Sequence, residues 1–166
     1  QHLAPPLDMS TEVYEPATRT WRTAPHPLTA SRDDAAGVTL ADGRVLVVGG
    51  WHQGTLLTSA ELFDPATEQW SATAPLALGR SRFALTALPD GRAAVSGGLE
   101  STTYGATTDV ELWNPATGTW SAGTPLSHGR AGHRVVPLGD GAYLVVGTTR
   151  VTADSLPETT SEIWRP

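Results

Sequence analysis

The chain has 166 residues, 39% of them hydrophobic, which suits one well-buried folded domain. Its net charge is -6 and its basic residues are all arginines, so a nucleic-acid backbone is not an expected partner. The absence of cysteine excludes disulfides, thiolate metal sites and cysteine nucleophiles. No apolar run approaches the roughly 20 residues of a membrane-spanning helix.

The first predicted elements are two strands, at residues 12–14 and 20–24, joined by the segment 15–18. This segment reads Glu-Pro-Ala-Thr, and proline fixes φ at the first central position of a turn. The same kind of turn returns at residues 64–67 and 114–117, each time with a Trp shortly after it. We therefore expect three copies of one hairpin, made of a third and a fourth strand.

A second kind of hairpin is predicted where Asp-Gly pairs separate two apolar runs, at residues 42–43, 90–91 and 140–141. Such a pair favours a type I′ turn, which needs positive φ at both central residues. The first and second strands on either side of these turns are predicted at residues 35–40 and 44–48, 83–88 and 92–96, and 133–138 and 143–146. No window shows an apolar period of 3.6 residues, so no helix is expected.

The predicted elements repeat about every 50 residues, in three registers that agree with one another. The Trp residues step by 49 and 50, and the arginines before the first strands step by 48 and 50, as shown by Trp21, Trp70, Trp120, Arg32, Arg80 and Arg130. The Asp-Gly pairs also step by 48 and 50. Each period is thus predicted to be a four-stranded antiparallel sheet.

The repeat resembles the kelch repeat of β-propellers, whose period is about 50 residues. The matching residues are the double glycines, the aromatic-then-Trp pairs and the first-strand arginines, namely Gly49-Gly50, Gly97-Gly98, Tyr14/Trp21, Phe63/Trp70, Trp113/Trp120, Arg32, Arg80 and Arg130. The segment Leu-Pro-Asp-Gly-Arg before an apolar strand is most similar to the repeats of secreted bacterial kelch proteins and of the central domain of galactose oxidase. The third copy reads Val146-Gly147-Thr148 and lacks the second glycine.

The resemblance implies an all-β fold, a kelch-type β-propeller segment of four-stranded antiparallel blades. Residues 1–11 are expected to be an N-terminal tail, followed by the third and fourth strands of a partial blade at 12–31. Two whole blades are expected at 32–79 and 80–129, and a blade without its fourth strand at 130–166.

One chain therefore makes an incomplete ring, because a propeller needs at least about four blades. Two blade faces would be left in water, and a stable soluble chain does not expose apolar faces of that size. Another copy of the chain, or the rest of a longer chain, is expected to complete the propeller. The resemblance further implies a secreted or extracellular protein of bacterial type.

In resembling propellers, ligands bind on the face formed by the loops between strands two and three and between strands four and one. Here these loops vary in length and sequence while the strands do not, which is typical of functional loops on a rigid scaffold. Trp51, with His52 and Gln53, could form an aromatic platform for a sugar ring or a peptide side chain. The alternative is a loop Trp folded back on the blade edge. Tyr104 in the next such loop has the same two interpretations.

The arginines repeated once per blade, Arg32, Arg80 and Arg130, could form a ring that binds a carboxylate. Their periodicity favours a structural alternative, in which they tie neighbouring blades together through backbone carbonyls. Arg82 and Arg134 are not repeated, which makes them better candidates for contacting a ligand.

No metal or cofactor is expected. The histidines His26, His52, His128 and His133 fall on different segments, and the adjacent carboxylates Asp33 and Asp34 are more often solvated than bound to Ca²⁺. A copper site like that of galactose oxidase would need a cysteine, and no hydrolase, metalloprotease or phosphate-binding motif occurs. The expected function is a non-catalytic module for protein or glycan recognition or structural assembly. The alternative is a section of a larger secreted oxidase, lyase or sugar epimerase, with catalytic residues partly outside this chain.

Overall fold

The computed structural model describes residues 9–100, 105–149 and 158–166, and every regular element in these ranges is a β-strand. The all-β fold that the sequence predicts is therefore confirmed. Within the same ranges, no helix is long and apolar enough to cross a membrane.

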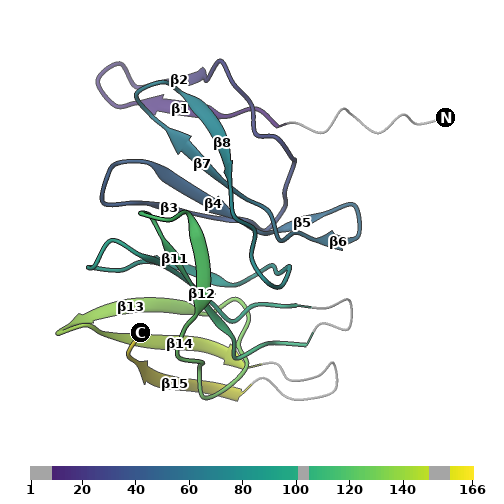
Figure 1. The fold of residues 1–166 in the computed structure, drawn as a ribbon, viewed down its shortest axis with the longest axis vertical. Coiled ribbons are helices and arrows are strands. Elements are labelled where there is room, and N and C mark those ends of the chain that lie inside the picture. The colour runs from purple at the N-terminus through teal and green to yellow at the C-terminus, as the bar shows by residue number, and fades with distance from the viewer. Residues whose placement is uncertain (1–8, 101–104, 150–157) are drawn as a thin grey trace.

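The strands form four main antiparallel sheets that stack one after another (Figure 1). The partial sheet contains β1 (Glu12–Glu15) and β2 (Thr20–Thr23). The first full sheet contains β3 (Ala36–Thr39), β4 (Val45–Val48), β7 (Ala60–Asp64) and β8 (Gln69–Thr73). The second full sheet contains β9 (Ala84–Ala87), β10 (Ala93–Ser96), β11 (Val110–Asn114) and β12 (Thr119–Ala122). The last sheet contains β13 (Arg134–Gly139), β14 (Ala142–Thr149) and β15 (Glu158–Trp164).

Both full sheets have the predicted meander order, each strand lying beside the next one of its repeat. This arrangement is that of partial kelch propeller blades. The limits predicted for each blade, such as 32–79 and 80–129, remain predictions.

The Asp-Gly turns differ from the type I′ turns that the sequence predicts at all three sites. Gly43 and Gly91 have positive φ, but the preceding aspartates do not. A type I′ turn needs both, and it forms only at Asp140-Gly141, with φ of 48° and 76°. There the preceding Gly139 interrupts the strand register and joins the ladder opposite Ala142, which leaves a two-residue loop. The other two copies have Ala or Pro at that position and make a longer loop that ends in the left-handed glycine.

The last sheet has longer central strands than the other two copies. In both full sheets the second strand ends at a double glycine, whose second members, Gly50 and Gly98, have φ of 97° and 102°. Thr148 stands at this position in the third copy, and a β-branched residue does not readily adopt positive φ. β14 therefore continues to Thr149, paired with β15, beyond the strand predicted at 143–146.

Two apolar clusters lie between successive sheets. One joins the first and second full sheets, where Leu46, Val48 and Leu62 pack with Trp113 and Val95. The other joins the second full sheet to the last sheet and is formed by Leu88, Ala94, Val110, Leu112, Leu126, Tyr143, Val145 and Trp164. In each cluster, aliphatic side chains of one sheet pack against aromatic side chains of the next. The contacts between sheets thus repeat along the stack, like the sequence.

Candidate functional site

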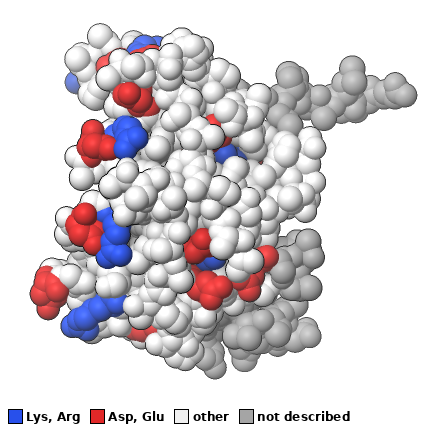
Figure 2. All heavy atoms as spheres, viewed as in Figure 1, with Lys and Arg blue, Asp and Glu red and all other residues white. Residues whose placement is uncertain are grey.

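The loops predicted to carry function and the short turns lie at opposite edges of the stack. In Figure 1, β5 (Trp51–His52) and β6 (Thr55–Leu56) project at the right, and the turns between first and second strands lie at the left. Figure 2 shows acidic and basic side chains next to each other along the left edge, which carries the turns. Two such pairs are Asp42–Arg44 and Asp90–Arg92, joined by ion pairs of 2.7 Å.

The segment after the first double glycine, in the predicted loop between the second and third strands, forms a small hairpin. β5 pairs with β6 through Trp51 opposite Leu56 and His52 opposite Thr55. Gln53 and Gly54, at its tip, have φ of 45° and 86°, the signs that a two-residue type I′ turn needs. The sequence signal was only Gly54 in the second central position. Gln53, in the first central position, does not indicate a type I′ turn, because glutamine is not among the residues that favour positive φ.

The backbone of Trp51 is fixed to the start of the same blade. The Trp51 amide donates to the Asp33 carbonyl at 2.7 Å, and the Asp33 amide donates to the Trp51 carbonyl at 2.8 Å. His52 Nδ1 lies 2.8 Å from the Ser31 hydroxyl. Two loops of the predicted binding face are thereby joined, while the Trp51 side chain stays exposed.

Arg82 occupies a position that repeats through the stack. Asp34, Arg82 and Gly132 stand at equivalent places and have φ of 51°, 53° and 70°. Arg82 Nε lies 3.3 Å from an oxygen of Asp34, and the Gly132 amide donates to the Arg82 carbonyl at 2.7 Å. Both charged side chains remain largely exposed. Arg82 therefore links three successive repeats through its backbone and side chain, and its charge remains accessible to a ligand.

The three repeated arginines lie inside their own sheets. Arg80 donates to the carbonyls of Gly97 and Asp109 at 3.1 and 3.2 Å and forms an ion pair with Glu111 at 2.8 Å. Arg32 and Arg130 make the corresponding ion pairs with Glu61 and Glu162, at 2.7 and 2.9 Å.

All three guanidinium groups are buried, so they are not displayed on the loop face. The carbonyl partners of these side chains lie within one sheet. Successive sheets are joined by the arginine backbones, because the Arg80 and Arg130 carbonyls accept the amides of Gly50 and Gly98 in the preceding sheet at 2.9 and 2.7 Å.

The glutamate partners of these arginines were missed in the sequence, although they recur in each third strand. One oxygen of each carboxylate binds the arginine, and the other accepts a backbone amide from the loop that enters the sheet. These amides belong to Thr29, Ala77 and Ser127, and the distances are 2.9, 2.8 and 2.7 Å. The repeated signal was a glutamate two residues before the aromatic residue of the third strand, as in Glu61-Leu62-Phe63.

His133 is buried, and its neighbour Arg134 is exposed on β13. His133 Nε2 lies 3.2 Å from the Ser96 hydroxyl, whereas Nδ1 has no hydrogen-bond partner in the described residues. Burial, with a smaller contribution from the nearby Arg130 charge, lowers the pKa of His133 to about 4. Arg134 Nη1 donates to the His133 carbonyl at 3.3 Å. Tyr104 lies outside the described residues.

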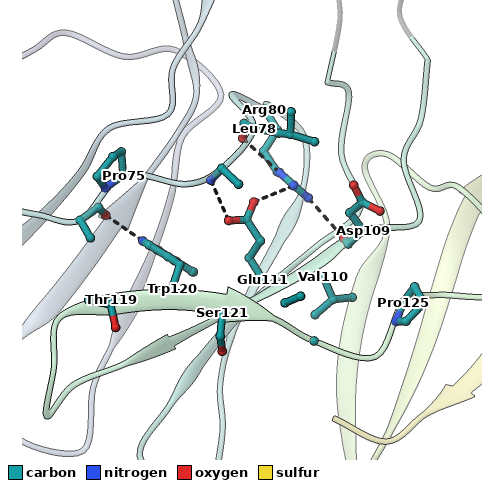
Figure 3. A pocket seen from close by; sticks show the side chains of 14 residues that line it. Pro75, Leu78, Arg80, Asp109, Val110, Glu111, Thr119, Trp120, Ser121 and Pro125 are labelled. Carbon is teal, nitrogen blue, oxygen red and sulfur yellow. Dashed lines mark hydrogen bonds and ion pairs between the residues drawn. The ribbon is translucent and has the colours of Figure 1, made fainter.

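A groove of about 570 Å³ lies between the loop 74–79 and the outer strands β11 and β12 of the second full sheet (Figure 3). Its apolar lining includes Pro75, Leu78 and Trp120. Trp120 Nε1 donates to the Ala74 carbonyl at 2.8 Å, so the indole fixes the loop to the sheet. The sequence did not predict this groove, because its walls come from two successive repeats.

The histidines considered as metal ligands are not part of a larger cluster. Among the residues that the structure describes, His, Asp and Glu side chains form no group of three or more that could hold a metal ion.

Comparison with known proteins agrees with the repeat. The Kelch motif family matches residues 35–77, which include the whole first full sheet. Kelch-like protein 4 of Homo sapiens is 34% identical to this chain over 70 residues, which are 42% of this chain and 10% of that relative. The chain thus spans a small part of the length of the curated relative it matches. With the two meander sheets and their repeated aromatic contacts, these matches identify the chain as a kelch-repeat protein.

Proposed function

We propose that the chain is a protein-recognition module whose loop face, centred on the Trp51 hairpin, contacts the partner. The observation that carries this proposal is an exposed indole on a backbone held by hydrogen bonds to Asp33 and, through His52, to Ser31. Aromatic side chains of this kind contribute much of the binding free energy of protein interfaces. A preformed hairpin loses little conformational entropy when it binds.

The surroundings of Trp51 suit a mixed apolar and polar contact. Gln53 at the hairpin tip is exposed and can exchange hydrogen bonds with a partner. Asp34 follows Asp33, the backbone partner of Trp51, and forms an ion pair with Arg82 in which both charged side chains stay largely exposed. An aromatic centre with polar groups around it is the usual composition of a protein interface. A glycan is the alternative ligand, because an indole face also stacks on a sugar ring.

The binding test works with an unidentified partner. A random-peptide phage library is selected on the immobilised wild-type chain, and the affinities of the selected peptides are measured by calorimetry. We expect Trp51→Ala to weaken these peptides about 30-fold, corresponding to roughly 2 kcal/mol for an aromatic anchor. Arg92→Ala, at the opposite edge, should leave their affinity unchanged. Selected peptides that bind Trp51→Ala as tightly as the wild type would contradict the proposal.

A glycan array with the same three proteins distinguishes the two ligand classes. Binding of glycans that requires Trp51, without any peptide selected, would replace protein recognition by glycan recognition. The enzyme alternative and the secreted location remain expectations from the resemblance.

We further propose that blades from outside this chain cover the two ends of the stack. They come either from another copy of the chain or from the rest of a longer one.

A further inference from the structure

The last sheet exposes an apolar face across all three of its strands. Four large hydrophobic side chains on this sheet are exposed, namely Val136, Leu138, Val146 and Ile163. The register pairs Val136 with Leu144 and Leu144 with Ile163, which places these cross-strand neighbours on the same face. We call this surface the open face.

The equivalent residues in the two full sheets are buried. Leu138 is 52% exposed, whereas its counterparts Leu40 and Leu88 are 4% and 6% exposed. Ile163 is 59% exposed, whereas Leu62 and Leu112 are 7% and 6% exposed. Val48 and Ser96, the counterparts of Val146, are also buried. In each of the two full sheets, the surface equivalent to the open face is therefore covered by the next sheet.

The internal contacts show what kind of surface covers such a face. Leu62 and its neighbours pack against Trp113, with Trp120 at the margin of the same cluster. Leu112 and its neighbours pack against Tyr143 and Trp164. In both cases the covering surface presents two aromatic side chains that lie opposite each other on neighbouring strands, Trp113 with Trp120 and Tyr143 with Trp164. The complement of the open face is therefore an exposed pair of aromatic residues on neighbouring strands.

Such a pair is exposed at the other end of the same stack, on the partial sheet (Figure 1). The rings of Tyr14 and Trp21 lie 5.1 Å apart at 47°, nearly the geometry of Phe63 and Trp70, at 5.0 Å and 45°. Tyr14 is 44% exposed, whereas its counterpart Trp113 is fully buried. We call this surface the aromatic end.

We propose that copies of this chain associate head to tail, with the open face of one copy covering the aromatic end of the next. The contact would continue the stacking that the chain already makes between its own sheets. It would remove from water two apolar surfaces larger than isolated exposed side chains. Because the two surfaces differ, the association is heterologous, and repeated contacts build either a closed ring or an open array. The proposal concerns surfaces distinct from the recognition face around Trp51.

Two substitutions at exposed positions test the contact without touching a core. Ile163→Asp places a charge on the open face, and Trp21→Asp places one on the aromatic end. Circular dichroism should show that both variants keep the wild-type strand content. Light scattering after size exclusion should give the wild type a mass above that of a single 17.4 kDa chain, rising with concentration. Each variant alone should give the mass of one chain.

The mixture of the two variants is the decisive sample. The Trp21→Asp chain keeps its open face and the Ile163→Asp chain keeps its aromatic end, so the mixture should form a one-to-one dimer and nothing larger. A wild type that stays monomeric at the highest concentration would overturn the proposal. So would a Trp21→Asp variant that dimerises alone, because two open faces would then be pairing with each other. Trp51→Ala should associate like the wild type, which separates this result from that of the peptide-binding test.

Discussion

At the scale of single residues, the same place in the repeat holds Ala35, Phe83 and His133. Phe83 packs beside Gly49 of the preceding sheet, and His133 lies in the same way beside Gly97. The place is therefore an apolar slot between sheets, and a histidine is disfavoured there in its charged form. The charges of Arg130 and Arg134 also lower the pKa of His133, and the Glu162 carboxylate raises it by less than burial lowers it.

Because His133 is buried in this slot, we predict that the free energy of unfolding falls in mild acid. The pKa of His133 is about 4 in the folded chain and near 6.5 in the unfolded chain, so the unfolded chain binds the proton first as the pH falls. The contribution of neutral His133 to stability is complete above pH 6.5 and is lost progressively down to pH 4. Urea unfolding should show a loss of about 2 kcal/mol between pH 7.5 and pH 5.

His133→Phe, which copies Phe83, should abolish most of this loss. The exposed His128 offers a matched control, and His128→Phe should keep the wild-type dependence on pH. An unchanged loss in His133→Phe would show that other groups cause it.

At the scale of the elements, the second glycine of each pair follows the second strand and lies against the residues that lead into the first strand of its own sheet. A Cβ atom added to Gly98 would lie 2.7 Å from the Ser81 carbonyl oxygen and 2.9 Å from Phe83 Cβ. A Cβ atom added to Gly91, in the Asp-Gly turn, would have no neighbour within 4 Å. Both glycines have positive φ, of 102° and 87°, so they differ mainly in the space around them.

Alanine at these two positions therefore separates backbone strain from steric overlap. Gly91→Ala should lower the free energy of unfolding by about 1–2 kcal/mol, the cost of positive φ for a residue with a Cβ atom. Gly98→Ala carries the same cost and also forces apart atoms that cannot move freely, so the loss should exceed about 3 kcal/mol. Urea denaturation of both variants measures the difference. Equal losses would mean that Ser81 and Phe83 move aside easily.

The elements that the sequence predicts well are those whose turns are encoded by one residue type. Pro65 in the turn at residues 64–67, and the Gly residues of the Asp-Gly pairs, predict the positions of the hairpins to within a residue or two. The β5–β6 hairpin was missed because Gln53 adopts a φ of 45°, although glutamine is not among the residues that favour positive φ. The extension of β14 was missed because it follows from a backbone conformation: Thr148 does not readily adopt the positive φ with which the second glycine ends the strand in the other copies.

The candidate site was less predictable than the fold, for a reason of distance along the chain. Arg80 and Glu111 are 31 residues apart, and only the sheet register brings them together. Sequence periodicity showed that Arg80 repeats but not whether its side chain is buried or displayed. Trp51 could be identified as unusual, because the other copies have no aromatic residue after the double glycine. Its hydrogen-bonded hairpin required the structure.

At the scale of the whole molecule, the second full sheet differs from the last sheet in its number of neighbours. The second full sheet contributes Trp113 to one apolar cluster and Leu112 to the other. The last sheet contributes to the second cluster, and its other side is the open face. In a stack of repeats, stability is approximately the sum of the sheets and of their nearest-neighbour contacts. The loss of an equivalent ion pair should therefore destabilise more neighbouring strands when it occurs in the second full sheet than when it occurs in the last sheet.

The substitutions Arg80→Met and Arg130→Met remove equivalent ion pairs, because each leaves a largely buried glutamate without its cation. Losing one partner of a buried pair costs about 3–5 kcal/mol. In the Ile163→Asp background, which keeps the chain monomeric, hydrogen exchange should show where protection is lost. Arg130→Met should expose mainly β13, β14 and β15. Arg80→Met should expose strands on both sides of its sheet, β4 and β7 included, because both apolar clusters depend on that sheet. Equal patterns in the two variants would mean that the stack opens as a single unit.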